Sequence, residues 1–150
     1  MKESPGLGLF YFIFPSGISG SLINNPMQTI NPLIFSKPKG HYSPAIVHNG
    51  LVFVSGQLPT DPDGSPVLGT IEEQTELCLA RVKTILEAAN SDLGHVLKVS
   101  IFVADIKDWP KVNEVFARFF GEHRPARIVV PSGMLNHNCS IEVDCVAAVA

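Results

Sequence analysis

Short runs of apolar residues, bounded by turn-forming residues, recur along the chain from residue 45 onward. The first two, at residues 45–48 and 51–57, are separated by Asn49-Gly50. An Asn-Gly pair predicts a two-residue hairpin because both positions tolerate a positive φ. Three further runs have the length and the β-branched content of strands: 96–104, 127–130 and 141–149. The pattern predicts a strand for each run, with a hairpin between the first two.

Two segments between these runs have the period of amphipathic helices. Thr70 and Glu73 are spaced as a capping box at the start of the first helix. Its apolar face predicts a helix that runs to about residue 89 and is made of Ile71, Cys78, Val82, Ile85 and Ala89. Asp108 is expected to cap the second helix, with Pro110 in its first turn. The apolar face of that helix follows the same spacing, at Val112, Val115, Phe116, Phe119 and Phe120.

The order of these elements, β-β-α-β-α-β-β, predicts an α+β fold with two helices on one face of a mixed sheet. The strands also carry apolar side chains for the other face, and the rest of the chain offers nothing to cover it. An apolar sheet face of this size predicts a symmetric homo-oligomer. The alternative is a curled sheet that buries its own second face.

The first stretch of the chain differs from the rest. No charged residue occurs from Ser4 to Ser36, and Pro15, Gly17 and Gly20 interrupt the apolar run too early for a membrane-spanning helix. We expect residues 1–26 to be an extension outside the fold, with Met27 as a plausible internal start. Residues 27–150 are then a single domain.

Composition narrows the class of protein further. The 150 residues are 45% hydrophobic and 17% charged, as in one globular domain, and the net charge is -3. The eleven Lys and Arg residues are scattered, which argues against nucleic acid as a partner. The three cysteines lack the spacing of metal ligands. We therefore expect a reduced, cytoplasmic protein with no structural disulfide, no metal and no membrane attachment.

Three positions could carry chemistry. Arg127, at the start of an apolar strand, is suited to binding a carboxylate through two parallel hydrogen bonds, although most arginines are simply exposed. Alternation places Glu142 and Asp144 on one face of the last strand. Glu142 is either solvated there or lies at a partly buried subunit interface that raises its pKa. Ser55 has no nucleophile motif around it, and Gly56 predicts a close approach of a ligand or strand.

A set of short motifs, taken together and in order, resembles the YjgF/Rid family, specifically its RidA-type members. The resemblance covers residues 27–150. The motifs are Gly40-His41-Tyr42-Ser43-Pro44-Ala45, Val52-Phe53-Val54-Ser55-Gly56-Gln57-Leu58-Pro59, Glu72-Glu73-Gln74-Thr75, Val112-Asn113-Glu114-Val115-Phe116, Pro125-Ala126-Arg127 and Ile141-Glu142-Val143.

The resemblance implies a chorismate-mutase-like fold, assembled as a homotrimer with clefts between subunits. RidA-type proteins hydrolyse reactive 2-imino acids and their enamine tautomers to 2-oxo acids and ammonia, without a cofactor. By similarity, Arg127 would bind the substrate carboxylate and Glu142 would position the attacking water or relay its proton. The other residues expected to line the cleft are Tyr42, Ser55, Gly56, Asn113 and Val129.

The chain departs from the family pattern near this expected cleft. Val129 stands where many RidA-type members have a cysteine, Pro131-Ser132-Gly133 replaces an acidic continuation of the strand, and His137-Asn138 also differs. We expect the strand after Arg127 to bend or end early, and substrate choice to shift if the missing thiol matters. Two other functions remain open: a non-catalytic module that binds 2-oxo acids, and the endoribonuclease activity attributed to some members, against which the acidic charge argues.

Overall fold

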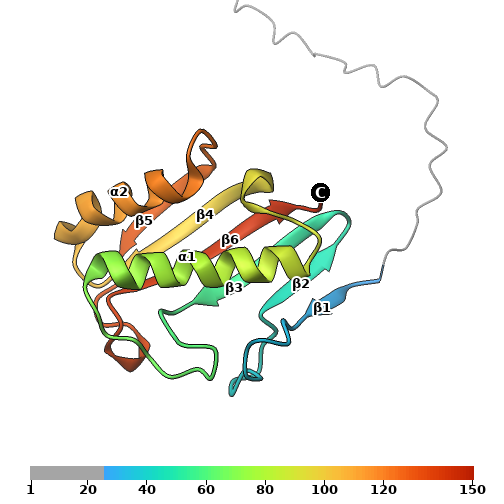
Figure 1. The fold of residues 1–150 in the computed structure, drawn as a ribbon, viewed down its shortest axis with the longest axis horizontal. Coiled ribbons are helices and arrows are strands. Elements are labelled where there is room, and N and C mark those ends of the chain that lie inside the picture. Colours follow the sequence, from blue (N-terminus) through green and yellow to red (C-terminus); the bar gives the residue numbers. More distant parts are fainter. Residues whose placement is uncertain (1–25) are drawn as a thin grey trace, which may run out of the picture.

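The computed structural model of the protein describes residues 26–150, and the prediction for residues 1–26 falls outside them except for Pro26. Six strands form one mixed sheet in the order β1-β2-β3-β6-β4-β5 (Figure 1). The strands are β1 (Gln28–Ile30), β2 (Ala45–His48), β3 (Leu51–Gln57), β4 (Val96–Val103), β5 (Ala126–Pro131) and β6 (Ile141–Ala148). Neighbouring strands are antiparallel, except that β4 and β5 are parallel.

The predicted hairpin is confirmed: Asn49 and Gly50 join β2 and β3 with φ values of 49° and 76°. β1 was not predicted. Its three residues pair with β2, but only Ile30 among them is partly buried. A strand this short and polar shows no alternation that sequence inspection could detect.

The helices are α1 (Ile71–Ala88) and α2 (Trp109–Phe120). The capping box of α1 is present, with the Thr70 hydroxyl accepting from the Glu73 N–H and the Glu73 carboxylate accepting from the Thr70 N–H. The predicted cap of α2 is wrong in one respect, because the Asp108 side chain makes no capping hydrogen bond. Asp108 is the last residue of a short 3-10 helix, Ile106–Asp108, so its backbone is already helical.

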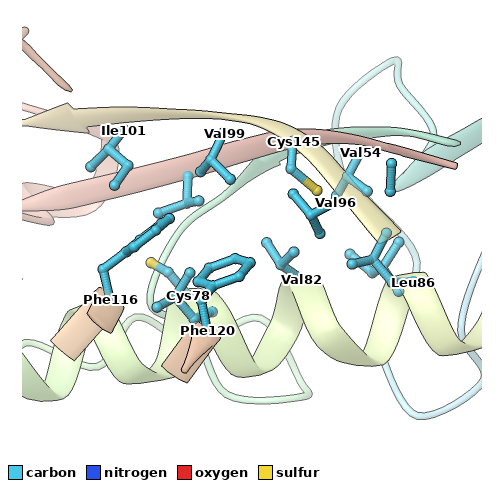
Figure 2. Close-up of a cluster of buried hydrophobic side chains, with 14 of the residues drawn as sticks. Val54, Cys78, Val82, Leu86, Val96, Val99, Ile101, Phe116, Phe120 and Cys145 are labelled. Atoms are coloured by element: carbon cyan, nitrogen blue, oxygen red, sulfur yellow. The ribbon is translucent and has the colours of Figure 1, made fainter. Parts of the chain in front are cut away.

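Both helices lie on one face of the sheet, as predicted (Figure 1). The core lies between them and the strands: Val82 and Leu86 of α1 and Phe116 and Phe120 of α2 point toward Val99 and its neighbours (Figure 2). Burying one such side chain contributes about 1.5–3 kcal/mol to folding. The helices therefore fix the positions of β3, β4 and β6 relative to one another.

Residues 26–150 leave the other face of the sheet open. Phe53 of β3 and Ile128 of β5 belong to it and are 45% and 49% exposed. The sheet does not close on itself, because β1 and β5 are its two edges. The described residues thus leave an apolar sheet surface uncovered. No helix in the described part of the chain is long and apolar enough to cross a membrane.

Candidate functional site

A β-bulge in β3 shapes one part of the candidate site. Val54 pairs with Cys145 and Gln57 with Val143, so β3 has one more residue than β6 between these pairs. The bulge contains Ser55 and Gly56. Ser55 is held in place because its Oγ donates to the Ser43 carbonyl at 2.7 Å and its N–H to the Pro44 carbonyl at 2.9 Å.

Glu142 lies directly against this bulge. Its neighbours Ile141 and Val143 are fully buried toward the helices, so alternation places Glu142 on the open face of the sheet. A Cβ atom at position 56 would collide with the Glu142 carboxylate. Gly56 therefore permits a close approach, as predicted, although the group that approaches is a side chain of β6. Burial raises the pKa of Glu142, and the nearby charge of Asp144 raises it further.

Gln74 of α1 anchors the segment that leads into Glu142. Its side chain is buried and makes two hydrogen bonds: Nε2 donates to the Gly69 carbonyl and Oε1 accepts from the Ser140 N–H, both at 2.8 Å. Ser140 is two residues before Glu142, at the point where β6 begins. The helix thus anchors the start of the strand that carries Glu142 through the buried amide of Gln74. The sequence analysis did not assign this role to Gln74.

Arg127 forms a second group with residues of α2. It pairs with Val99 and so faces the helices, where its Nη2 donates to Asn113 Oδ1 at 2.8 Å and its guanidinium carbon lies 4.6 Å from the centre of the Phe116 ring. The side chain is half-buried, and burial lowers its pKa from a very high ordinary value, so it remains charged. No Asp or Glu in the described residues forms an ion pair with it. Val129 is on the same face of β5 and packs against the core.

The two groups lie apart within one chain. Arg127 is in register with Val99 of β4, whereas Glu142 is in register with Phe102, three residues along and on the opposite face. With strand spacings of about 4.8 Å and a rise of about 3.3 Å per residue, their backbones are roughly 14 Å apart. One chain therefore brings Ser55, Gly56 and Glu142 together, and separately Asn113, Arg127 and Val129.

Tyr42 belongs with the first group. It is 57% exposed and, with Gly56, lines a cavity of about 270 Å³ next to the end of β3. Arg81 of α1 also lines this cavity and was not identified from the sequence. The sequence did contain a signal for Arg81, because it stands among apolar residues of the predicted helix. A charged side chain next to a buried helix face needs a polar partner.

The three cysteines lie in the interior of the fold, and the chain turns shortly after the end of β5. Cys78, Cys139 and Cys145 are buried free thiols, and burial raises the pKa of each, to about 12 for Cys145. Cys139 is only 1% exposed, although polar residues surround it in the sequence. β5 continues through Pro131, and the chain then turns at Gly133, where φ is 73°.

Comparison with known proteins places this geometry in a family. A sequence model described as Endoribonuclease L-PSP matches residues 35–149, most of the chain. The chain belongs to this family. A RutC family protein of Pyrococcus horikoshii is 43% identical over 112 residues, which are 74% of this chain and 89% of the relative. The chloroplastic Reactive Intermediate Deaminase A of Arabidopsis thaliana is 40% identical over 72% of this chain and 58% of its own length.

Solved structures of the family have the same fold. The YjgF gene product of E. coli is 30% identical, with a TM-score of 0.77 over 82% of this chain and 99% of its own. E. coli TdcF, whose structure contains bound serine, is 28% identical, with the same TM-score over 82% of this chain and 99% of its own. These matches confirm the resemblance to the YjgF/Rid family and the α+β fold. They also show that a member of this family binds a small amino acid.

Proposed function

We propose that this chain is an imine deaminase, which hydrolyses 2-imino acids and their enamine tautomers to 2-oxo acids and ammonia. The observation that carries the proposal is the pair of half-sites: a half-buried guanidinium without a carboxylate partner in residues 26–150, and a carboxylate with a raised pKa. The Arg127 guanidinium suits a substrate carboxylate, and the Glu142 carboxylate suits a water molecule. The name of the Arabidopsis relative supports the same reaction class.

The proposal requires a homotrimer with its active sites between subunits. Arg127 and Glu142 are on opposite faces of the sheet, so a single chain cannot present both to one small molecule. The open face that carries Glu142 also carries exposed Phe53 and Ile128, which association would bury. We propose that a neighbouring copy covers this face and that the β5–α2 group of one subunit lies at the bulge of the next. We propose residues 27–150 as the unit that assembles.

Arg127 is suited to orient the substrate in such a cleft. Its guanidinium is held by Asn113 and by the Phe116 ring, so little side-chain entropy remains to be lost when an anion binds. Guanidinium and carboxylate can form two parallel hydrogen bonds, which fix the plane of the 2-imino acid. Val129 would contact the substrate beside this ion pair.

Glu142 is suited to activate water. As water oxygen bonds to the imine carbon, the Glu142 carboxylate takes a proton from it, which gives a neutral carbinolamine if the imine was protonated. Glu142 then returns the proton to the amine nitrogen, and the C–N bond breaks with its electron pair on nitrogen. The Glu142 carboxylate takes the hydroxyl proton as the carbonyl forms and passes it to the departing ammonia. The products are a 2-oxo acid and ammonium. A carboxylate whose pKa is raised by burial is a better base for this step.

An assay with a dehydratase tests the proposal. A pyridoxal-phosphate-dependent dehydratase releases 2-aminocrotonate from threonine, and the purified chain should accelerate the appearance of 2-oxobutanoate. Arg127→Ala should weaken transition-state binding by about 2–5 kcal/mol, because the substrate anion loses its donor. Arg124→Ala, an exposed arginine three residues earlier, is the matched control. If the wild-type chain does not accelerate the reaction, the proposal fails for this substrate.

A non-catalytic binding module is the second candidate, and the serine bound to TdcF favours it. The same half-sites would then hold a 2-oxo or amino acid without turnover. A thermal shift with 2-oxobutanoate that Arg127→Ala abolishes, together with no acceleration of imine hydrolysis, would select this function. The cytoplasmic location also stays a prediction, since the Arabidopsis relative is named as chloroplastic.

A further inference from the structure

The cavity beside Tyr42 has an unusual charge. The chain has more acidic than basic residues, yet the charged residues that line this cavity are Lys37, Lys39 and Arg81, and no carboxylate lines it. His137 is also at its wall. Asp63 interacts electrostatically with Lys39, but it is exposed and its carboxylate accepts a hydrogen bond from the Ser65 N–H. The cavity is therefore a small, positively charged space in an acidic protein.

Arg81 is a half-buried cation without an acidic partner in the described part of the chain. Its Nε donates to Gln57 Oε1 at 3.3 Å, and its Nη1 donates to the carbonyls of Thr60 and Asp61, both at 3.2 Å. The Phe35 ring covers the guanidinium, with its centre 4.1 Å from the guanidinium carbon. These contacts hold the guanidinium rigidly, and its Nη2 group has no hydrogen bond among the described residues.

The cavity joins the proposed active site through shared residues. Tyr42 and Gly56 line it, and Gly56 contacts Glu142. Gln57 links the two parts directly, because its Oε1 accepts from Arg81 while its Nε2 donates to the carbonyls of Ser55 and Gly56 at 2.9 and 3.3 Å. A substrate placed at Glu142 could therefore extend its side chain past the bulge toward Arg81.

We infer that the Arg81 cavity binds a second carboxylate, so that the preferred substrates are 2-imino acids with an acidic side chain. The inference rests on the proposed function, with Arg127 binding the first carboxylate and Arg81 recognising the second. A volume of about 270 Å³ suits the side chain of a small molecule. A charged group buried here without an anionic partner is stabilised when a ligand supplies one.

The test compares substrates of equal length that differ by one carboxylate. Flavin-dependent amino-acid oxidases would generate 2-iminoglutarate and 2-iminopentanoate, and kcat/KM is measured for each. We expect wild type to prefer the dicarboxylate roughly tenfold or more, because a charge-assisted hydrogen bond is lost with the neutral substrate. Arg81→Gln should bring the ratio close to one. Lys83→Gln removes an exposed charge from the same helix and should leave the ratio unchanged.

A second variant separates recognition from folding, since Arg81 also holds the loop at Thr60 and Asp61. Lys37→Gln/Lys39→Gln removes two exposed charges of the cavity and should lower the ratio in a salt-dependent way. Equal kcat/KM values in wild type, or an equal loss for both substrates in Arg81→Gln, would overturn the inference.

Titration with 2-oxoglutarate and 2-oxopentanoate measures binding and therefore tests the Arg81 cavity without requiring turnover. Tighter binding of 2-oxoglutarate, lost in Arg81→Gln, supports the cavity even if neither imine is hydrolysed and the proposed deaminase function fails. Equal affinity for the two 2-oxo acids overturns the inference that the Arg81 cavity binds a second carboxylate.

Discussion

The surroundings of Glu142 show how neighbouring residues can raise the pKa of a single carboxyl group. Gly56 leaves room for its carboxylate, and burial together with Asp144 raises its pKa. The sequence analysis identified both Gly56 and Glu142 but could not pair them, because a bulge in β3 determines which residues meet across the two strands. The pairing depends on register, which local sequence does not specify.

The pH dependence of catalysis tests this environment. Glu142 must be ionised to accept a proton, so kcat/KM should fall as the pH drops through its pKa. Since the charge of Asp144 raises that pKa, Asp144→Asn should move the acidic limb of the pH–rate profile to lower pH. In Glu142→Gln the limb should disappear, with a rate loss of roughly 10²–10⁴-fold. A limb that stays in place or moves upward in Asp144→Asn would show that Asp144 does not act on the catalytic base.

At the scale of elements, hydrophobic periodicity predicted the two helices and the longer strands, because each has a clear apolar face. It could not predict β1, whose residues are mostly exposed. It also missed the buried polar links of α1: Gln74 to the start of β6 and Arg81 to Gln57. Such links depend on which loops the helix meets in the folded chain.

Replacing Gln74 tests whether α1 positions the start of β6. Gln74→Ala leaves the Ser140 N–H and the Gly69 carbonyl without their partner, which should lower the free energy of unfolding by about 1–3 kcal/mol. We also expect kcat to fall more than KM rises, because Glu142 would lose its fixed position. Urea denaturation and steady-state kinetics measure the two effects. Gln28→Ala, at an exposed position of β1, should change stability by less than about 0.5 kcal/mol.

At the scale of the whole molecule, the sheet separates the two halves of the candidate site. The sequence pattern singled out Arg127 and Glu142, and the family resemblance assigned them their roles. Their placement on opposite faces follows from the strand order and from the register of β4 with β5 and β6. Strand order is a long-range property, so the sequence alone did not show that Arg127 and Glu142 are far apart in one chain. The open apolar face is the physical reason why we propose assembly.

The state of assembly can be measured directly by light scattering after size-exclusion chromatography. A trimer of 16.2 kDa chains has a mass of about 49 kDa. Phe53→Lys places a charge on the open face and should yield monomers without imine hydrolysis. Leu68→Lys changes an apolar residue outside the sheet that is 56% exposed, against 45% for Phe53, and serves as control. A monomeric wild-type chain with full activity would contradict assembly through this face.

The most direct test of the shared site mixes two inactive variants. Arg127→Ala subunits retain Glu142, and Glu142→Gln subunits retain Arg127, so a mixed trimer contains some clefts with both groups intact. Co-refolding equal amounts should restore about a quarter of the wild-type rate, since each cleft draws its two groups independently from two subunits. If Arg127 and Glu142 act within the same chain, or if either is not required, the mixture will show no gain over the separate variants.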